Sequence, residues 1–432
     1  MDHLGLDLGT TTISAAVLDA DGRLLCTRTV PGGAAVAGQP WERKQDARGI
    51  EHAALSLLDG LLQEFPDIGC VGLTGQMHGI VYVDAAGQLL SPLYTWQDET
   101  GAQPGPDGKS TAARLTARTG YPLASGYGLV TLACHQAAGT IPDGAAAVCT
   151  IADYLAMRLS GRSAPCLTPS MAASLGLFDG TGFDREAVRR AGLPERLLPE
   201  VSEEAELGGG RLRVFAALGD NQASFLGAGH GRLDAPLVNI GTGSQFSFFT
   251  KERRTVPGLE TRPFPGGWLL TGAPLCGGRS FALLERFFRQ TAELVTGTPC
   301  PSAYPAMLRA LEAPMPDDVP QFRTTFAGTR QDPAERAVLS GLDEENFAPV
   351  PLLHALLRGM ADELSACYRA ALKAGCAPAG RLLGSGNGLR RNPALQRAVE
   401  RSFGLPLTLA AVPEEAACGA ALFTRMQHEA AL

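Results

Sequence analysis

Short apolar runs separated by polar turns open the chain. One run covers 4–8 and encloses a single carboxylate, Asp7, and a second run covers 13–18. Asp21-Gly22 is a dipeptide typical of a hairpin turn, and 23–30 can return as a third strand. The pattern predicts that the chain begins as an antiparallel meander of three strands.

Farther along, apolar residues recur at the helical spacing of three and four positions in several stretches. They predict helices over 47–65, 151–159, 352–372, 392–403 and 414–426. Shorter apolar runs predict strands over 70–73, 80–83, 212–218 and 381–383, and a strand–turn–strand element over 238–249. The Gly- and Pro-rich segment 101–110 predicts a surface loop.

The sequence of the first turn is similar to that of a segment in the second half of the chain. The sequence DLGTTT at 7–12 resembles NIGTGS at 239–244, and each follows an apolar run and precedes a strand of alternating character. The two copies lie far too distant from each other for a solenoid repeat. They indicate two domains of one topology, an N-terminal domain over 1–230 and a C-terminal domain over 231–432.

Composition narrows the class of protein. The 432 residues are 45% hydrophobic and 19% charged, as in a globular chain, and a net charge of −7 argues against a nucleic-acid partner. No apolar run is long enough to span a bilayer and no signal-like segment opens the chain, so we expect a soluble, cytoplasmic protein without a membrane partner. Ten scattered cysteines, Cys276 among them, form no C-x-x-C pair and predict buried free thiols.

Glycine and threonine in the two similar turns suit the binding of phosphate. Glycine lets the backbone approach a phosphate closely, and threonine hydroxyls and turn amides donate hydrogen bonds to its oxygens. One such turn is common in ordinary hairpins, but two in equivalent places favour phosphate binding at 9–12 and at 241–243. Asp7, at a strand end beside the first turn, could hold Mg²⁺ through water.

Two common nucleotide motifs are missing. Gly108-Lys109-Ser110 has the end of a P-loop, but Gln103 stands where the first glycine of that motif is required. A Rossmann fingerprint in the right context is also absent. Instead, a glycine cluster at 384–388 follows a predicted strand and precedes a predicted helix. It could lie against a flat ligand such as adenine, or form a flexible loop.

Two polar segments offer side chains for a sugar. Between two predicted strands, Gln76 and His78 supply directed donors and acceptors that suit several hydroxyls, although His78 could also be structural. Trp96 adds an aromatic face and Asp98 a carboxylate. The alternative for the second segment is a surface loop anchored in the core by its Trp.

Asp220 is the candidate base. It follows an apolar strand and Gly219. Phosphoryl transfer needs alignment, metal charge and a carboxylate that accepts the proton of the substrate hydroxyl. The alternative role for an aspartate in this place is a helix N-cap.

The order of these motifs resembles that of the FGGY-type carbohydrate kinases, which share the ATPase fold of actin, Hsp70 and hexokinase. The resemblance spans nearly the whole chain and rests on 6–11, 74–79, 95–98, 219–220, 239–243 and 384–387. It implies an α/β, two-lobed fold of duplicated ribonuclease H-like domains, with Mg-ATP in a cleft between lobes that close to exclude water.

The resemblance also implies a role for each matched residue. Asp220 would be the catalytic base and, together with Asp7, would hold Mg²⁺. The sugar site would comprise Gln76, Met77, His78, Trp96 and Asp98. The ATP site would comprise Gly9, Thr10, Thr11, Thr12, Gly241, Thr242, Gly243, Gly384, Ser385, Gly386 and Asn387.

Within the family, the chain is most similar to sedoheptulokinases and next to xylulokinases. The segments that favour the first subgroup are 95–98, 124–128, 150–154, 172–174, 178–179 and 217–224. The chain departs from the family in two places. Glu99-Thr100 stands where a basic residue often follows the carboxylate, and a Lys- and Trp-bearing signature is missing around 128–135.

The sequence therefore predicts an ATP- and Mg²⁺-dependent kinase that converts a ketose, sedoheptulose first, to its phosphate. Xylulose or another ketose or polyol is the second choice, and the chain is expected to be a monomer or homodimer. An ATP-dependent switch protein, like actin or a chaperone, would share the fold but have no use for Gln76, His78 and Asp98. A degenerate kinase that senses sugar is disfavoured by the intact Asp7 and Asp220.

Overall fold

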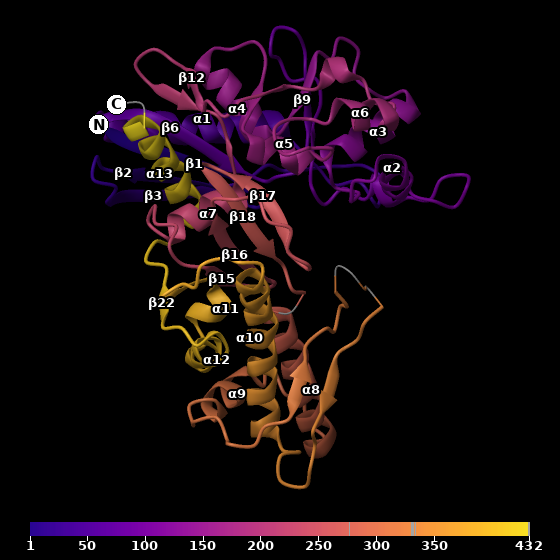
Figure 1. Ribbon diagram of the computed structural model, residues 1–432, viewed down its shortest axis with the longest axis vertical. Coiled ribbons are helices and arrows are strands. Elements are labelled where there is room, and N and C mark those ends of the chain that lie inside the picture. Colours follow the sequence, from indigo (N-terminus) through magenta and orange to yellow (C-terminus); the bar gives the residue numbers. More distant parts are fainter. Residues whose placement is uncertain (276, 330–331, 333, 431–432) are drawn as a thin grey trace. The chain divides into compact units, whose positions relative to one another are not determined.

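The computed structural model describes residues 1–275, 277–329, 332 and 334–430, and the chain divides into two compact units (Figure 1). The first unit comprises 1–231, 263–265 and the segment from Val412 onward, and the second comprises 232–262 and 266–411. Each unit has its own mixed β-sheet and its own hydrophobic core. The division differs from a simple boundary at 230 because the last helix of the chain belongs to the first unit.

One side of the first sheet is the meander that the sequence predicts. In order, the strands are β12 (Glu206–Gly208), β13 (Arg213–Phe215), β6 (Ile68–Gly75), β1 (Asp2–Leu8), β2 (Thr12–Leu18) and β3 (Leu24–Pro31). β1, β2 and β3 are antiparallel neighbours, and β6 runs parallel to β1. The strand predicted over 212–218 is split into β13 and β14 (Leu218–Gly219), because Val214 pairs with Val71 but Leu218 pairs with Thr74, which leaves one extra residue between them.

Helices cover both faces of the first sheet. α1 (Ala47–Glu64) and α4 (Ile151–Ser160) contact one face, and α7 (Asp220–Ala228) and α13 (Glu415–Ala430) pack together on the other (Figure 1). Gly5 and Gly72 pair across β1 and β6, and a Cβ on either would lie within 2.3 Å of a carbonyl oxygen of α13. These two glycines therefore let the final helix lie close against the sheet.

The second sheet repeats the strand order of the first. Its strands are, in order, β17 (Glu260–Phe264), β18 (Gly267–Gly272), β16 (Ser244–Thr250), β15 (Leu237–Ile240), β21 (Leu382–Ser385) and β22 (Leu407–Leu409). The antiparallel set β15, β16 and β18 corresponds to β1, β2 and β3, and the parallel strands β21 and β22 correspond to β6 and β13. The two similar sequences, 7–12 and 239–244, therefore lie in the same hairpin of each sheet.

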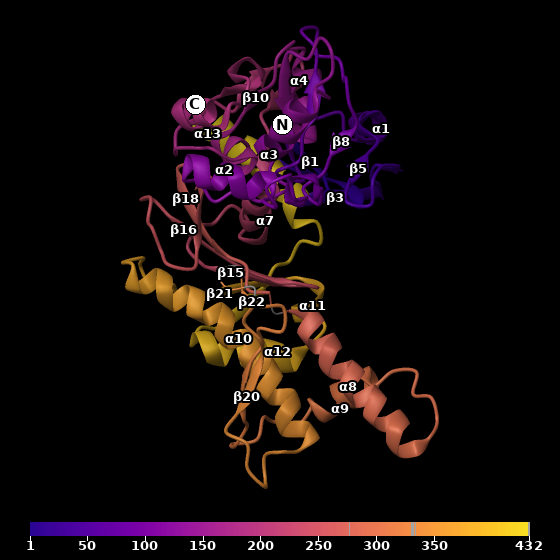
Figure 2. The same cartoon turned by 90° about the vertical axis from the view of Figure 1, so that its right-hand side faces the viewer.

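The described residues of the second unit form five helices. They are α8 (Gly278–Thr296), α9 (Tyr304–Ala310), α10 (Pro349–Lys373), α11 (Asn387–Arg390) and α12 (Pro393–Phe403). α10 and α12 lie side by side (Figure 2), and α10 also contacts the hairpin β19 (Gln321–Arg323) and β20 (Val338–Ser340). The sequence predicted α10 and α12, but α11 begins within the glycine cluster, where no helix was predicted.

The remaining elements are short and lie in the first unit. They are β4 (Ala35–Val36), β5 (Lys44–Gln45), β7 (Val81–Val83), β8 (Leu93–Tyr94), η1 (Thr100–Ala102), α2 (Thr111–Thr119), α3 (Gly128–Ala138), β9 (Ala147–Cys149), β10 (Cys166–Leu167), α5 (Pro169–Leu175), α6 (Arg185–Ala191), η2 (Glu195–Leu197) and β11 (Glu200–Val201). No described helix is both long enough and apolar enough to cross a membrane.

The described cysteines are free thiols. Six of them are buried, whereas Cys26, Cys300 and Cys367 are partly exposed. Cys276, which the sequence analysis grouped with them, lies outside the described residues. Burial of free thiols is therefore the common state of these cysteines, but not the state of all.

Candidate functional site

Two aspartates meet at one edge of the first sheet. β1 and β14 both run parallel to β6, so the carboxyl ends of the three strands lie at the same edge. Thr74 of β6 pairs with Asp7 on one side and with Leu218 on the other, and Asp220 follows two residues later as the first residue of α7. Asp7 points to the same face as Gly5, because side chains two apart on a strand share a face. That face is the one covered by α7 and α13.

The electrostatics of this edge favour a bound cation. Burial, together with the negative charges of Asp220 and Glu414, raises the pKa of Asp7 to about 7. Near neutral pH the Asp7 carboxyl is thus poised between its two protonation states, and a nearby cation would favour the ionised one. Within the described residues, no group of three His, Cys, Asp or Glu side chains is arranged as a ready metal site.

The first Gly-Thr turn is held in place by side chains from two other segments. The carbonyl oxygen of Thr10 accepts a hydrogen bond from Nε2 of Gln45 at 2.7 Å, and its hydroxyl accepts one from the Trp96 indole at 3.1 Å. The carbonyl of Thr11 accepts from the Gly32 amide at 2.8 Å. Thr11 and Thr12 are exposed, so their side chains can reach a ligand.

Gln76 and Met77 lie at the end of β6, close to Asp220. Gln76 is 3% exposed and donates from Nε2 to Oε1 of Gln45 at 2.9 Å. Met77 is buried, and its thioether would be within 3 Å of a Cβ at Gly219, so glycine there makes room for it. The structure thus places Met77 against the residue that precedes the candidate base, and Gln76 directly after Gly75, which pairs with that residue.

His78 is held by the helix that also holds the strand before Asp220. Its backbone is left-handed with a φ of 72°, its ring stacks on Tyr127 at 4.7 Å, and Nδ1 donates to the Ser174 carbonyl at 2.6 Å. The Ser174 hydroxyl accepts from the His78 amide, and Ser170, on the same helix α5, accepts from the Gly219 amide. One short helix therefore positions both the sugar segment and the start of α7.

Trp96 and Asp98 differ in their surroundings. Trp96 is 47% exposed, so its ring can serve as an open aromatic face. Asp98 is 1% exposed, and its two carboxylate oxygens accept hydrogen bonds from the backbone amides of Arg43 at 2.9 Å and Thr100 at 3.0 Å. In the structure, the carboxylate of Asp98 links two loops through these hydrogen bonds. Its role toward sugar stays a prediction.

Three buried polar atoms beside Asp220 have no hydrogen-bond partner. They are Oγ1 of Thr74, Oε1 of Gln76 and Oε1 of Gln222. A buried acceptor without a donor is unfavourable by about 1–3 kcal/mol, so such atoms are rare in folded proteins. Their concentration around the end of β6 and the first turn of α7 indicates a place where a hydroxyl-rich ligand can complete the hydrogen bonding.

In the second unit, a pocket of about 800 Å³ brings the second Gly-Thr turn and the glycine cluster together. It is lined by Gly241, Thr242, Gly278, Arg279, Phe281, Ala282, Tyr304, Leu308, Asn387, Gly388, Arg391 and Asn392. Gly384 and Ser385 lie beneath it in β21 and are buried, and Gly386, at a φ of 88°, backs onto the Ile240 carbonyl. Gly243 lies against Gly277.

Several lining residues were missed by the sequence analysis. Phe281 and Tyr304 have ring centroids 5.9 Å apart and supply an aromatic wall, but they are remote in sequence from every motif. Arg279 and Arg391 add positive charge to the pocket. Arg391 stands only three residues beyond the glycine cluster, so its position after a candidate nucleotide loop was a usable signal.

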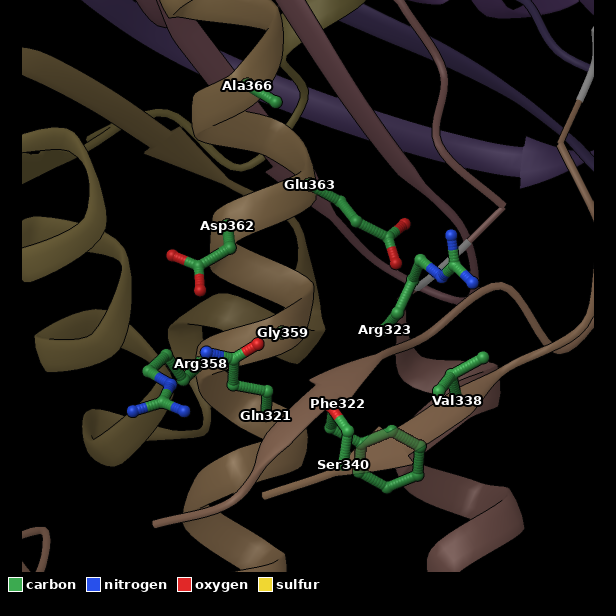
Figure 3. Close-up of a pocket in the computed structure, with 10 residues that line it drawn as sticks. All are labelled: Gln321, Phe322, Arg323, Val338, Ser340, Arg358, Gly359, Asp362, Glu363 and Ala366. Carbon is green, nitrogen blue, oxygen red and sulfur yellow. The ribbon is translucent and has the colours of Figure 1, made fainter. Parts of the chain in front are cut away.

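A second pocket of about 790 Å³ in the same unit lies between the β19–β20 hairpin and α10 (Figure 3). Its charged side chains already have partners within the protein: Glu363 accepts from Thr324, Asp362 accepts from Ser402, and Arg323 pairs with Glu335. None of the predicted site residues lines it. The first pocket is therefore the better candidate for a nucleotide.

Comparison with known proteins extends over the whole chain. The N-terminal domain model of the FGGY family of carbohydrate kinases matches residues 3–234, and the C-terminal domain model matches residues 237–428. Sedoheptulokinase from Mus musculus is 29% identical over 97% of this chain and 96% of its own length. Xylulose kinase from Streptomyces coelicolor is 26% identical over 97% of this chain and 86% of its own length.

A solved structure shows the same fold. The crystal structure of a "xyloylose kinase" from Brucella ovis aligns with a TM-score of 0.82 at 22% identity, covering 100% of this chain and 91% of that one. With the repeated strand order, this likeness confirms the predicted α/β fold, the duplicated ATPase fold of actin, Hsp70 and hexokinase.

Proposed function

Because this chain belongs to the FGGY family of carbohydrate kinases, we propose that it phosphorylates a ketose, with sedoheptulose as the first substrate and D-xylulose as the second. Kinases of this family use ATP as phosphate donor. The choice of sugar rests on the match of 29% over nearly the full length of a sedoheptulokinase, against 26% for a xylulose kinase. The observation that carries the reaction is the strand-end aspartate pair beside three unpartnered polar atoms.

In the proposed reaction, Asp220 is the general base. It accepts the proton of the substrate hydroxyl while that oxygen forms a bond to the γ-phosphorus of ATP and the bond to the β-phosphate oxygen breaks, which releases ADP. Gln76, Met77, His78 and Trp96 bind and orient the sugar beside Asp220. The acceptor oxygens of Gln76 and Gln222 suit a ligand that carries many hydroxyl donors.

Mg²⁺ fits the chemistry of the aspartate pair. Two carboxylates supplemented by water and phosphate oxygens are a common set of ligands for this ion. The raised pKa of Asp7 means that burial and neighbouring negative charges disfavour its ionised form, and a bound cation would stabilise that form. Asp7 and Asp220 would hold the ion, which would supply positive charge to the phosphate oxygens.

ATP is assigned to the turns and to the pocket of the second unit. Gly241 and Thr242 open the pocket to phosphate, and the Phe281–Tyr304 wall offers a face for the base. Arg279 and Arg391 add charge complementary to phosphate. Gly9, Thr10, Thr11 and Thr12 form the corresponding turn of the first unit.

The experiment is ADP release with Mg-ATP over a panel of sugars. Sedoheptulose, D-xylulose, D-ribulose, L-ribulose, glycerol and a blank without sugar would be compared by kcat/KM. The proposal expects the highest kcat/KM for sedoheptulose. A preference for D-xylulose would retain the reaction and replace the substrate, and ADP release that is independent of sugar would overturn the kinase assignment.

A further inference from the structure

We propose that Gln45 is a positioning residue that links the sugar segment to the first phosphate turn. The inference rests on the proposed function, because it concerns how the same site is organised. No motif in the sequence marks Gln45, which lies in the two-residue strand β5. Its side-chain amide nevertheless stands between Thr10 and Gln76 and is bonded to both.

The partners of Gln45 fix the orientation of its amide. Nε2 lies 2.7 Å from the Thr10 carbonyl and 3.2 Å from the Gly33 carbonyl, and only an N–H can donate to both of these acceptors. The opposite atom is then Oε1, which must accept from Nε2 of Gln76 at 2.9 Å. The amide of Gln76 is oriented in turn, and its Oε1 is the buried oxygen that lacks a donor.

This order of donors gives a directed chain with one open end. It runs from the Thr10 carbonyl through Gln45 to Gln76, and it ends at an acceptor in the predicted sugar site. A sugar hydroxyl that donates to Oε1 of Gln76 would complete the chain and hold both amides in their present orientation. Sugar binding would thereby stabilise the peptide group of Thr10 in the turn that meets phosphate.

The backbone around Gln45 is suited to such a role. Gln45 pairs with Ala35 on one side and with Leu93 of β8 on the other, and its side chain is 9% exposed. Two residues earlier, Arg43 bonds to both Thr95 and Asp98. The same loop carries Trp96, which bonds to the Thr10 hydroxyl, so the turn is held from two points on the sugar side.

Two substitutions separate the two ends of the link. Gln45→Met conserves volume and removes the hydrogen bonds to Thr10, Gly33 and Gln76, so it is expected to raise KM for the sugar and lower kcat, each by about tenfold. Gln45→Glu keeps an oxygen for Gln76 but, when ionised, has no donor for Thr10. It is expected to keep KM for the sugar within about twofold while kcat falls by about tenfold or more at pH 8.

The Gln45→Glu variant also allows a test by pH, because a recovery of kcat at lower pH is not expected if Gln45 acts through packing alone. A protonated carboxyl has an O–H that can donate to the Thr10 carbonyl while its other oxygen accepts from Gln76. Burial raises the pKa of a carboxyl, so the kcat of the variant relative to wild type should recover as the pH falls from 8 to 6. The neighbouring charges along the chain are Lys44, which pairs with Glu42, and Asp46, which caps α1.

Gln136→Met is the matched control. Gln136 also donates its side-chain amide to a backbone carbonyl, that of Gly192 at 2.7 Å, but it is exposed on α3. It should leave both kinetic constants and their pH dependence unchanged, and thermal unfolding would verify that all variants are folded.

The outcomes separate the two proposals. A wild-type protein that phosphorylates no sugar would refute the proposed function. An active wild type whose Gln45→Met variant is folded and kinetically unchanged would refute the link. A Gln45→Glu variant whose kcat relative to wild type is the same from pH 8 to pH 6 would refute the donor role of Gln45 toward Thr10.

Discussion

The two Gly-Thr turns occupy equivalent places in two sheets of one topology, yet they differ in charge. Asp7 precedes the first turn and pairs with Thr74, whereas Asn239 precedes the second and pairs with Ser385. Asp220 follows β14 at the edge of the first sheet. In the second sheet the chain continues after β22 with Ala410, Ala411 and Val412, none of which carries a charge. The carboxylates are thus confined to the unit that is proposed to bind the sugar.

The turns also differ in how they are held. The first is tied by the side chains of Gln45 and Trp96 in addition to the Gly32 amide, whereas the second is tied to the start of α8 by backbone amides, since Gly278 donates to Gly241 and Arg279 donates to Thr242. Side-chain ties can respond to what binds near them, but backbone ties at the start of a helix are fixed by the fold. The duplicated scaffold therefore has a charged turn that is tied in part by side chains and a neutral turn that is tied to a helix by backbone amides.

Removal of the proposed base, which has no charged counterpart directly after β22 of the second sheet, is expected to have the largest effect on activity. Asp220→Asn is expected to lower kcat by about 10²–10⁴, because the amide cannot accept the proton of the hydroxyl. ADP affinity, measured by calorimetry, should change little. The exposed Asp143→Asn is the control, and a variant of Asp220 with near-normal kcat would show that the base lies elsewhere.

Asp7→Asn makes the first turn resemble the second. We expect kcat to fall by about 10² and the Mg²⁺ concentration for half-maximal rate to rise, because one carboxylate of the proposed metal site is lost. Initial rates over a Mg²⁺ titration would measure both effects. An unchanged Mg²⁺ dependence would remove Asp7 from the metal site.

The reverse change, Asn239→Asp, gives the second turn a charge. The Asn239 amide donates to the Ser385 hydroxyl at 3.0 Å, and a serine hydroxyl can reverse to donate to a carboxylate, so the fold should persist. Repulsion of phosphate is expected to raise KM for ATP by about tenfold. Gln290→Glu on the exposed side of α8 adds the same charge at a distance and should leave KM unaltered.

The smallest effect concerns stability and pH. The pKa of Asp7 is about 7 in the folded protein and near 4 when unfolded. The stabilisation that the protonated Asp7 carboxyl gives to the folded state is therefore complete below pH 4 and is lost as the pH rises to 7. Asn cannot titrate. Without Mg²⁺, wild type should therefore lose roughly 1–3 kcal/mol of unfolding free energy relative to Asp7→Asn when the pH is raised from 5 to 8. Urea unfolding at the two pH values measures this, and a constant difference would contradict it.

The sequence was most informative where local pattern and structure coincide. The opening meander, α1, α4, α10, α12 and α13 all lie where apolar spacing predicts them, because each buries one face against a sheet or a neighbouring helix. The family and the fold were also predicted correctly from the order of the motifs.

What the sequence did not predict depends on contacts between distant segments. The break between β13 and β14 follows from pairing with β6, and the wall of Phe281 and Tyr304 forms only when α8 and α9 meet. Gln45 is bonded to residues 35 positions before it and 31 positions after it, and neither separation leaves a mark on the local pattern.

The packing of α13 on Gly5 and Gly72 has a consequence for biosynthesis. β1 and β6 are translated well before α13, so the part of the sheet face that α13 covers lacks this helix until α13 has emerged. The second unit, a continuous stretch apart from three residues, can fold earlier. The first unit is thus completed only after the second unit has been synthesised, and until then its sheet lacks the helix that lies on Gly5 and Gly72.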